Sequence, residues 1–350
     1  MSASTSVSPS ASVTGHGRSR GGLACLVSAG VLWGTGGLFG SLLGHAAGLN
    51  PLAVAATRLL VGGALVVAFL LMTGRRRPSG WRPSGRAAWT RIAVTGALSA
   101  LFQACYFAAI ALTSVSLATL VTIGGTPVIV AVVERFTGHR DLGRSGLLTM
   151  AAALAGLGLL VGFPGGGLTE TAMLAGTGLS LASAAGFAAV TLIGGLPVDG
   201  LDDLGVNGYG FLLGGVALLP AAVVTGGFGV RPGLTGGDAL AAAGWLLALG
   251  LGPTAVAYVL YYRGLRTAPA STAALLSLLE PLTAAVIAAV FLGDRLDTAG
   301  LTGSAILLAA VVRAALDHRA VPGAGAHCPG GPPSGKNRQE APVASPSGPL

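Results

Sequence analysis

The sequence predicts an all-α integral membrane protein with ten transmembrane helices in two inverted five-helix repeats. Three observations predict this fold class. Only 9% of the 350 residues are charged whereas 52% are hydrophobic, and a soluble fold of this length would carry far more surface charge. Long stretches of the chain contain no charge at all, and the second part of the chain repeats the first.

The uncharged stretches divide into ten segments that can each cross a bilayer, because a spanning helix needs about 20 apolar residues. Helix-breaking residues separate them, such as Asn50-Pro51 after the first segment, Thr113-Ser114 after the third and the glycine run 165–167 after the fifth. The predicted spans are 22–44, 51–73, 90–112, 115–133, 145–163, 174–195, 206–225, 239–261, 270–292 and 298–316.

An internal repeat relates the two parts of the chain. A shift of 154 residues aligns 113–157 with 267–311 without a gap, so that Pro127 coincides with Pro281. A repeat of five spans crosses the membrane an odd number of times, so the halves must have opposite orientations. We therefore predict a first repeat over 21–165 and a second over 170–317. The segments 1–20 and 318–350 are rich in small and polar residues and are predicted to be disordered tails.

The basic residues predict the orientation. With the N-terminus inside, 17 of the 20 Arg and Lys residues fall in cytoplasmic segments, as expected for a multi-pass protein of the plasma membrane. Both termini are then cytoplasmic, and the lipid bilayer is a permanent partner. The net charge of +8 therefore belongs to cytoplasmic loops and does not indicate a nucleic-acid surface.

Two charged residues lie deep within predicted spans. Glu280 stands in an apolar run, where a charge at mid-depth costs about 2.5–3.5 kcal/mol and usually faces a partner or a water-filled path. Pro281 follows it and deprives the carbonyl of Ser277 of its helical hydrogen bond. Arg58 lies about 10 Å from the outer end of its span, and Glu280 lies about 15 Å from the inner end of its own. Across about 30 Å of hydrocarbon, roughly 5 Å separates them in height.

This arrangement has two interpretations. One is a cavity with a positive and a negative group for a zwitterionic or polar metabolite, and the other is a structural ion pair that touches no substrate. Inverted-repeat carriers bind substrate near the midplane, where helices of both halves are broken. The segments 124–127 and 279–281 fit that pattern, which makes Gly124, Gly125, Pro127 and Pro281 candidate hinges. The predicted substrate-binding residues are Glu280, Arg58, Trp33, Gln103, Tyr106, Thr126, Ser277 and Tyr258.

Other classes of function lack their motifs. No histidine lies in a predicted span and the three cysteines lack metal or disulfide spacing, so we expect no cofactor and no metal, and Glu280 is the sole candidate proton carrier. The motif His-Glu-x-x-His is absent and Thr235-Gly-Gly-Asp238 lacks the first glycine of an aspartyl protease motif, so an enzyme is not expected. A membrane sensor or assembly subunit is the remaining alternative. Glycine patterns such as Gly30-x-x-x-Gly34 favour close helix packing and would allow a homodimer without requiring one.

Short motifs along residues 21–317 resemble those of the EamA-type transporters of the drug/metabolite transporter superfamily. They are Trp33-Gly34, Asn50-Pro51 with Arg58, Ala111-Leu-Thr-Ser114 through Pro127, Tyr262-Arg-Gly-Leu265, Ala268-Pro-Ala-Ser271, Leu279-Glu-Pro281 and Leu292-Gly-Asp294. The chain departs from the family at Thr126, where the first half lacks an acid, and at Asp294, where glutamate is more frequent. The resemblance implies a secondary transporter that alternates access between two repeats. It also implies a metabolite, amino acid or drug-like small-molecule substrate, with export favoured over import.

Overall fold

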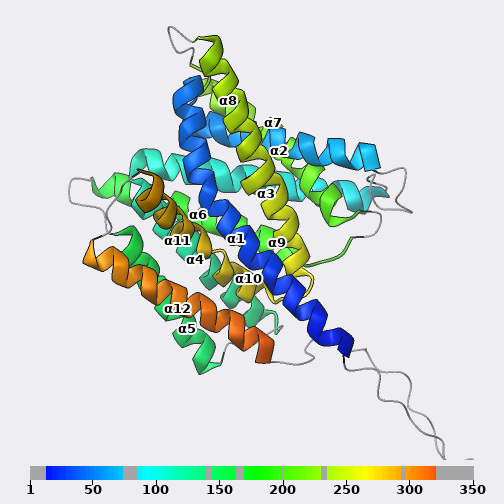
Figure 1. The fold of residues 1–350 in the computed structure, drawn as a ribbon, viewed down its shortest axis with the longest axis vertical. Coiled ribbons are helices and arrows are strands. Elements are labelled where there is room, and N and C mark those ends of the chain that lie inside the picture. Colours follow the sequence, from blue (N-terminus) through cyan, green and yellow to red (C-terminus); the bar gives the residue numbers. More distant parts are fainter. Residues whose placement is uncertain are drawn as a thin grey trace, which may run out of the picture.

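The computed structural model describes residues 13–73, 83, 85–138, 143–162, 169–198, 201–229, 235–292 and 297–320. Helices dominate this part of the chain (Figure 1), and apart from two isolated bridges, Leu49–Phe228 and Val198–Leu201, the described residues form no β-structure. Within the described ranges, ten helical segments are long and apolar enough to cross a membrane. The predicted fold class is therefore confirmed.

Two of the ten spans consist of more than one helical element. The eighth span joins α8, a π-helical segment η2 and α9, and the ninth joins α10, α11 and a second π-helical segment η3. The elements are α1 Val13–Ala47, α2 Pro51–Thr73, α3 Gly85–Leu112, α4 Val115–Phe136, α5 Arg144–Val161, α6 Glu170–Gly194, α7 Asp203–Val224, α8 Gly236–Leu249, η2 Gly250–Val256, α9 Ala257–Leu265, α10 Ala270–Leu276, α11 Leu279–Ile287, η3 Ala288–Leu292 and α12 Thr298–Ala320.

The ends of the chain differ in part from the sequence prediction. Residues 13–20 belong to α1 and residues 318–320 to α12, so these parts of the predicted disordered tails are helical. The rest of both tails lies outside the described residues, as do the glycine run 165–167 and the Asp294 of the last family motif.

Helices of the two halves interleave. α2 packs most extensively against α7, α3 against α6 and α7, α4 against α6, and α5 against α12, so each of these contacts joins the first half of the chain to the second. α1 packs along the eighth and ninth spans through α8, η2, α9 and α11. The largest core cluster draws buried residues from both halves, which places the centre of the molecule at the boundary between them.

Small residues make these inter-half contacts close. A Cβ atom at Gly156 of α5 would lie 2.8 Å from the carbonyl oxygen of Gly303 on α12, and one at Gly96 of α3 would lie 2.8 Å from that of Gly210 on α7. Only glycine allows backbones to approach this closely. The glycine patterns therefore serve packing within the bundle.

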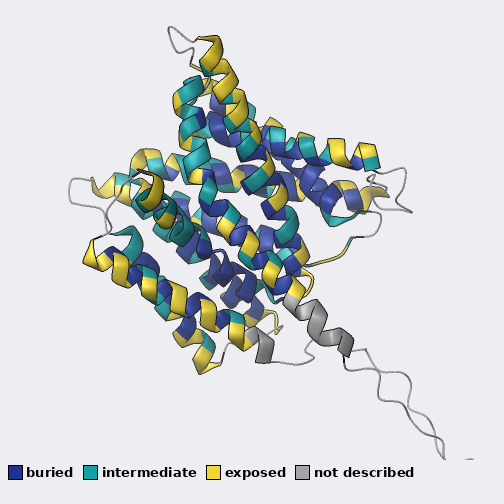
Figure 2. Ribbon diagram, viewed as in Figure 1, coloured by how far each residue is buried: buried dark blue, intermediate teal, exposed yellow. Residues whose placement is uncertain are grey.

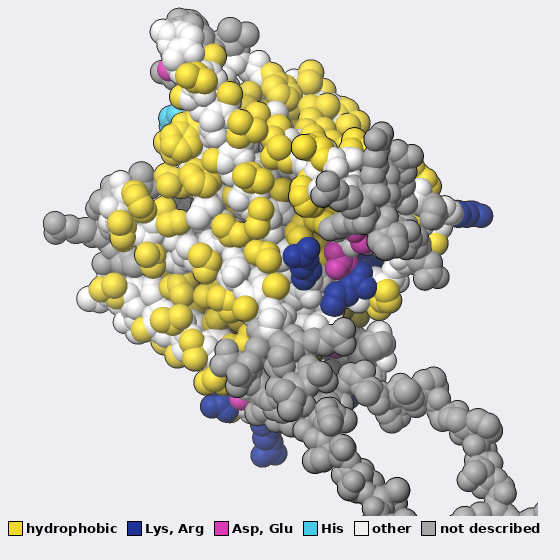
Figure 3. All heavy atoms as spheres, turned by 45° about the vertical axis from the view of Figure 1, so that its right-hand side comes forward, with side chains coloured by type: hydrophobic (Ala, Val, Ile, Leu, Met, Phe, Trp, Pro, Cys, Tyr) yellow, Lys and Arg dark blue, Asp and Glu magenta, His cyan; other side chains and the backbone are white. Residues whose placement is uncertain are grey.

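The outer surface of the bundle is apolar. Figure 2 shows buried residues concentrated inside the bundle and exposed ones on its outside, and Figure 3 shows hydrophobic side chains covering most of one face, with charged groups gathered in a few places. Large apolar side chains such as Met72, Phe136 and Val224 are more than four-fifths exposed, at 84%, 86% and 85%. A soluble monomer rarely exposes so much contiguous apolar surface, and a lipid environment accounts for it.

Candidate functional site

A cavity lies at the centre of the bundle, between the two halves. It offers about 70 Å³ to the centres of water-sized molecules, which is room for several waters or a small solute. Six of the eight predicted substrate-binding residues line it. The lining residues are Trp33, Arg58, Phe102, Gln103, Tyr106, Phe107, Ile123, Phe187, Pro253, Tyr258 and Glu280, which come from α1, α2, α3, α4, α6, η2, α9 and α11.

The polar groups of the cavity include one cation and one anion. Arg58 of α2 and Glu280 of α11 both line it, and their charges lie within electrostatic range of each other. Among the described side chains, ion pairs join Arg266 to Asp203 and Arg313 to Asp317, but none joins Arg58 to Glu280. The two charges therefore share one cavity without direct contact.

Two donors at the cavity lack hydrogen-bond partners. The Nε of Arg58 and the Nε1 of Trp33 are buried, and neither has a partner among the described residues. The hydroxyl of Tyr106, by contrast, is paired with that of Thr119 at 2.7 Å. Buried polar groups are nearly always satisfied by protein, water or ligand. The donors on Arg58 and Trp33 are therefore not engaged by other described side chains.

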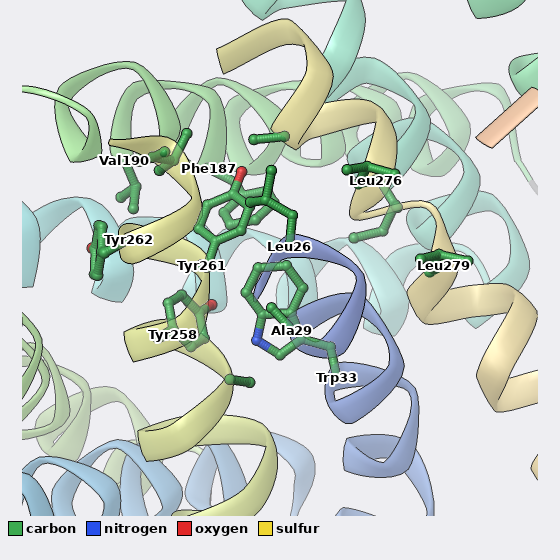
Figure 4. Close-up of a cluster of buried hydrophobic side chains, with 14 of the residues drawn as sticks. Leu26, Ala29, Trp33, Phe187, Val190, Tyr258, Tyr261, Tyr262, Leu276 and Leu279 are labelled. Carbon is green, nitrogen blue, oxygen red and sulfur yellow. The ribbon is translucent and has the colours of Figure 1, made fainter. Parts of the chain in front are cut away.

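Aromatic side chains cluster at the cavity, and Figure 4 shows the ring of Trp33 beside those of Phe187, Tyr258 and Tyr261. The ring of Trp33 lies 5.7 Å from that of Phe187, 5.0 Å from that of Tyr258 and 4.9 Å from that of Tyr261, centre to centre. The ring of Phe102 stacks on that of Phe187 at 5.2 Å. Aromatic pairs at these separations attract one another beyond simple burial, so these rings stabilise one another next to the cavity.

The ninth span is broken where the sequence predicts. α10 ends at Leu276 and α11 begins at Leu279, on either side of the break in Figure 4. The carbonyl of Ser277, predicted to be left free by Pro281, accepts a hydrogen bond from the N–H of Glu280 at 2.9 Å. The hydroxyl of Ser277 donates to the carbonyl of Ala274 at 2.7 Å and is buried. Ser277 therefore shapes the break that carries Glu280 and does not line the cavity.

The matching break predicted in the fourth span is absent. α4 continues through Pro127 from Val115 to Phe136. A Cβ at Gly124 would lie 3.2 Å from Leu154 of α5, and one at Gly125 would lie 3.3 Å from Ala184 of α6, so both glycines serve helix packing. Thr126 is fully buried, and its hydroxyl donates to the carbonyl of Thr122 at 2.8 Å. Thr126 is thus not at the cavity, and only the second half carries a joint at this position.

The π-helical segment η2 contributes to the site and was not predicted. Pro253 lines the cavity, and because it has no N–H it cannot donate to the carbonyl of Leu249. The hydroxyl of Thr254 donates to that carbonyl instead at 2.8 Å, and the amide of Asn207 donates to the carbonyl of Ala255 at 3.3 Å. π-Helical turns occur frequently at functional sites. The segment Gly250-Leu-Gly-Pro253, in the middle of a predicted span, is the sequence feature that could have indicated this irregular helical turn.

Replacing Thr254 with valine is expected to destabilise the protein by about 1 kcal/mol, because valine keeps the shape of the side chain but removes the buried hydrogen bond from its hydroxyl to the carbonyl of Leu249. The measurement is the thermal unfolding temperature in detergent. Thr302→Val is the matched control, because the hydroxyl of Thr302 is exposed on α12 and donates to the carbonyl of Thr298 at 2.7 Å. Equal losses in the two variants would contradict the role given to Thr254.

Within the described ranges, no group of three or more His, Cys, Asp and Glu side chains is arranged to hold a metal ion.

Comparison with known proteins places the chain among membrane transporters. A family described as "EamA-like transporter family" matches it twice, over residues 20–162 and 174–315. An uncharacterized transporter of Archaeoglobus fulgidus is 30% identical over 296 residues, which cover 84% of this chain and 96% of that protein. The uncharacterized transporter YwfM of Bacillus subtilis is 28% identical over 284 residues, covering 79% of this chain and 87% of the relative. A crystal structure of a protein 21% identical matches the fold with a TM-score of 0.67, covering 85% of this chain and 97% of that one.

Proposed function

This chain belongs to the EamA-like transporter family and is a multi-pass membrane transporter of that type, and we propose that it is a secondary carrier of a small zwitterionic metabolite. The substrate is an amino acid or a drug-like compound that bears both a positive and a negative charge. The carrier binds this substrate in the central cavity and exposes it alternately to the two sides of the membrane. The observation that carries the proposal is the cavity itself, which holds Arg58 and Glu280 without a direct ion pair.

The binding mode follows from the charges. A substrate carboxylate would accept from the guanidinium of Arg58 and the ring N–H of Trp33, both of which have buried donor atoms without protein partners. A substrate ammonium group would face Glu280, and the apolar part would lie against the rings of Phe102 and Phe187. A substrate that supplies both charges would compensate both buried side chains at once, which a neutral solute cannot do.

The orientation in the membrane is part of the proposal. Arg91 near the start of α3 donates to the carbonyl of Ile193 at the end of α6, and Arg266 after α9 pairs with Asp203 at the start of α7. These contacts gather the two basic residues at one end of the bundle. We assign that end to the cytoplasm of a plasma-membrane protein, with both termini on the same side. Export is the proposed direction.

The test is a thermal-unfolding screen of the purified protein against amino acids, nucleosides, sugars and cationic drugs, followed by flux measurement in proteoliposomes. A stabilising zwitterion that is also carried across the vesicle membrane is the expected result, since a ligand that binds the folded state raises its stability. Stabilisation by sugars or nucleosides alone would overturn the substrate class. Binding without flux for every stabilising compound would favour a sensor or assembly subunit instead.

A further inference from the structure

The two helical pieces of the ninth span contact different partners. α10, which precedes the break at Ser277 and Leu278, packs most closely against α4 and α12, whereas α11, which follows it, packs mainly along α1 and not appreciably on α4. Both pieces also touch α12. The two pieces can be followed in Figure 1. A helix that is divided in this way can move one piece against α4 while the other stays seated on α1.

An apolar cluster, called the seal below, packs α4, α6 and α10 together beside the cavity. Val130 of α4, Ala188 of α6 and Ala274 of α10 form one cluster, and all three are completely buried. Ile123, which lines the cavity, lies seven residues before Val130 on α4, or about 10 Å along the helix axis. In this structure the seal therefore holds α4 and α10 in contact about two helical turns from Ile123.

Glu134 lies just beyond this seal, in the last turn of α4, and the sequence analysis did not single it out. Its side chain is only 8% exposed. Its Oε1 accepts a long hydrogen bond of 3.4 Å from the N–H of Ser271, at the start of α10. Its Oε2 is buried and has no hydrogen-bond partner among the described residues. The carboxyl group is thus poorly satisfied while α4 and α10 are in contact.

We propose that Glu134 weakens this seal. Its carboxyl group lacks a full set of hydrogen bonds while α4 and α10 are in contact, so it destabilises that contact and promotes opening of the cavity at this end. A buried acceptor without a partner loses its hydration without compensation. When α10 moves away from α4, water reaches both oxygens and that loss is recovered. Glu134 is a positioning residue that touches no substrate, and the inference rests on the proposed alternating-access function.

The test compares opening rates in variants of Glu134 by cysteine labelling. The three native cysteines are replaced by alanine, and Ala274→Cys places a reporter of similar size within the seal. Glu134→Met keeps the length of the side chain and removes both oxygens. We expect a water-soluble maleimide to label the reporter at least about fivefold more slowly in Glu134→Met, with a higher unfolding temperature, because removal of an unsatisfied buried group favours the closed form. Glu134→Gln keeps unsatisfied polar atoms and is expected to label at a rate between the two.

The control is Glu170→Met, which makes the same change at an exposed residue of the first turn of α6. It is expected to leave the labelling rate unchanged. Faster or unchanged labelling in Glu134→Met would overturn the proposal, and so would a lower unfolding temperature or failure to fold, since each would mean that the carboxyl group holds the seal together. Labelling and unfolding need no substrate, so their outcome is separate from that of the transport measurement.

Discussion

Replacing Glu280 with glutamine is expected to lower transport by about tenfold or more and to abolish stabilisation by the substrate. Glutamine keeps the size of the side chain but removes the negative charge that would face a substrate ammonium group, and a hydrogen bond to a charged group contributes roughly 1.5–3 kcal/mol. The measurements are flux in proteoliposomes and the substrate-induced shift in unfolding temperature.

The control for Glu280→Gln is Asp317→Asn, an acid-to-amide change at an exposed position of α12 that pairs with Arg313 at 3.8 Å. It should leave flux unchanged. Glu280→Gln also leaves Arg58 as an uncompensated buried cation, which lowers stability by itself. The double variant with Arg58→Gln is therefore expected to regain stability without regaining flux. Full flux in Glu280→Gln would show that Glu280 lies outside the transport mechanism.

Replacing Gly34 with alanine is expected to destabilise the protein by about 1–3 kcal/mol and to reduce transport, because the added methyl group cannot be accommodated without movement of the ninth span. A Cβ at Gly34 would lie 2.5 Å from the Cβ of Thr283 and 2.8 Å from the carbonyl oxygen of Glu280. Thermal unfolding and flux are the measurements. α1 would be pushed away from α11 at the position where Glu280 enters the cavity.

Gly37→Ala is the matched control, on the same helix and one turn away. A Cβ at Gly37 would meet nothing within 4 Å, and alanine in place of glycine favours a helix by up to about 1 kcal/mol. Gly37→Ala should therefore keep or raise the unfolding temperature. A similar fall in unfolding temperature and flux in both variants would mean that the glycines of α1 act through helix flexibility and not through the contact with α11.

The ten spans and most of the site could be predicted from the sequence, because both depend on the cost of placing polar groups in hydrocarbon. That cost is a property of composition along the chain, and it singles out Arg58 and Glu280 whatever their neighbours are. It also indicates that aromatic residues with polar atoms, such as Trp33 and Tyr258, need a polar environment at one end.

The sequence did not predict the continuity of α4 or the places of two hydroxyl residues, because these depend on packing between helices and on local hydrogen bonds. Pro127 and Pro281 occupy matching positions, yet α4 is continuous, with Gly124 and Gly125 packed against α5 and α6. Thr126 and Ser277 point into helix contacts because their hydroxyl groups bond to carbonyls of their own helices. Small hydroxyl side chains readily satisfy themselves in this way, so a hydroxyl residue in a span is a weak indicator of a binding site.

The difference between the continuous α4 and the divided ninth span has a kinetic consequence. In a carrier whose halves were identical, the inward-facing and outward-facing conformations would be related by a two-fold rotation, so they would have equal free energies and interconvert with equal rates. If this chain alternates access as proposed, the joint in only one of the two related helices is expected to give the two conformations different free energies and the two reorientation steps unequal rates. For a passive carrier, the concentration of substrate that half-saturates transport then differs between the two faces of the membrane, while the ratio of maximal rate to that concentration stays the same on both.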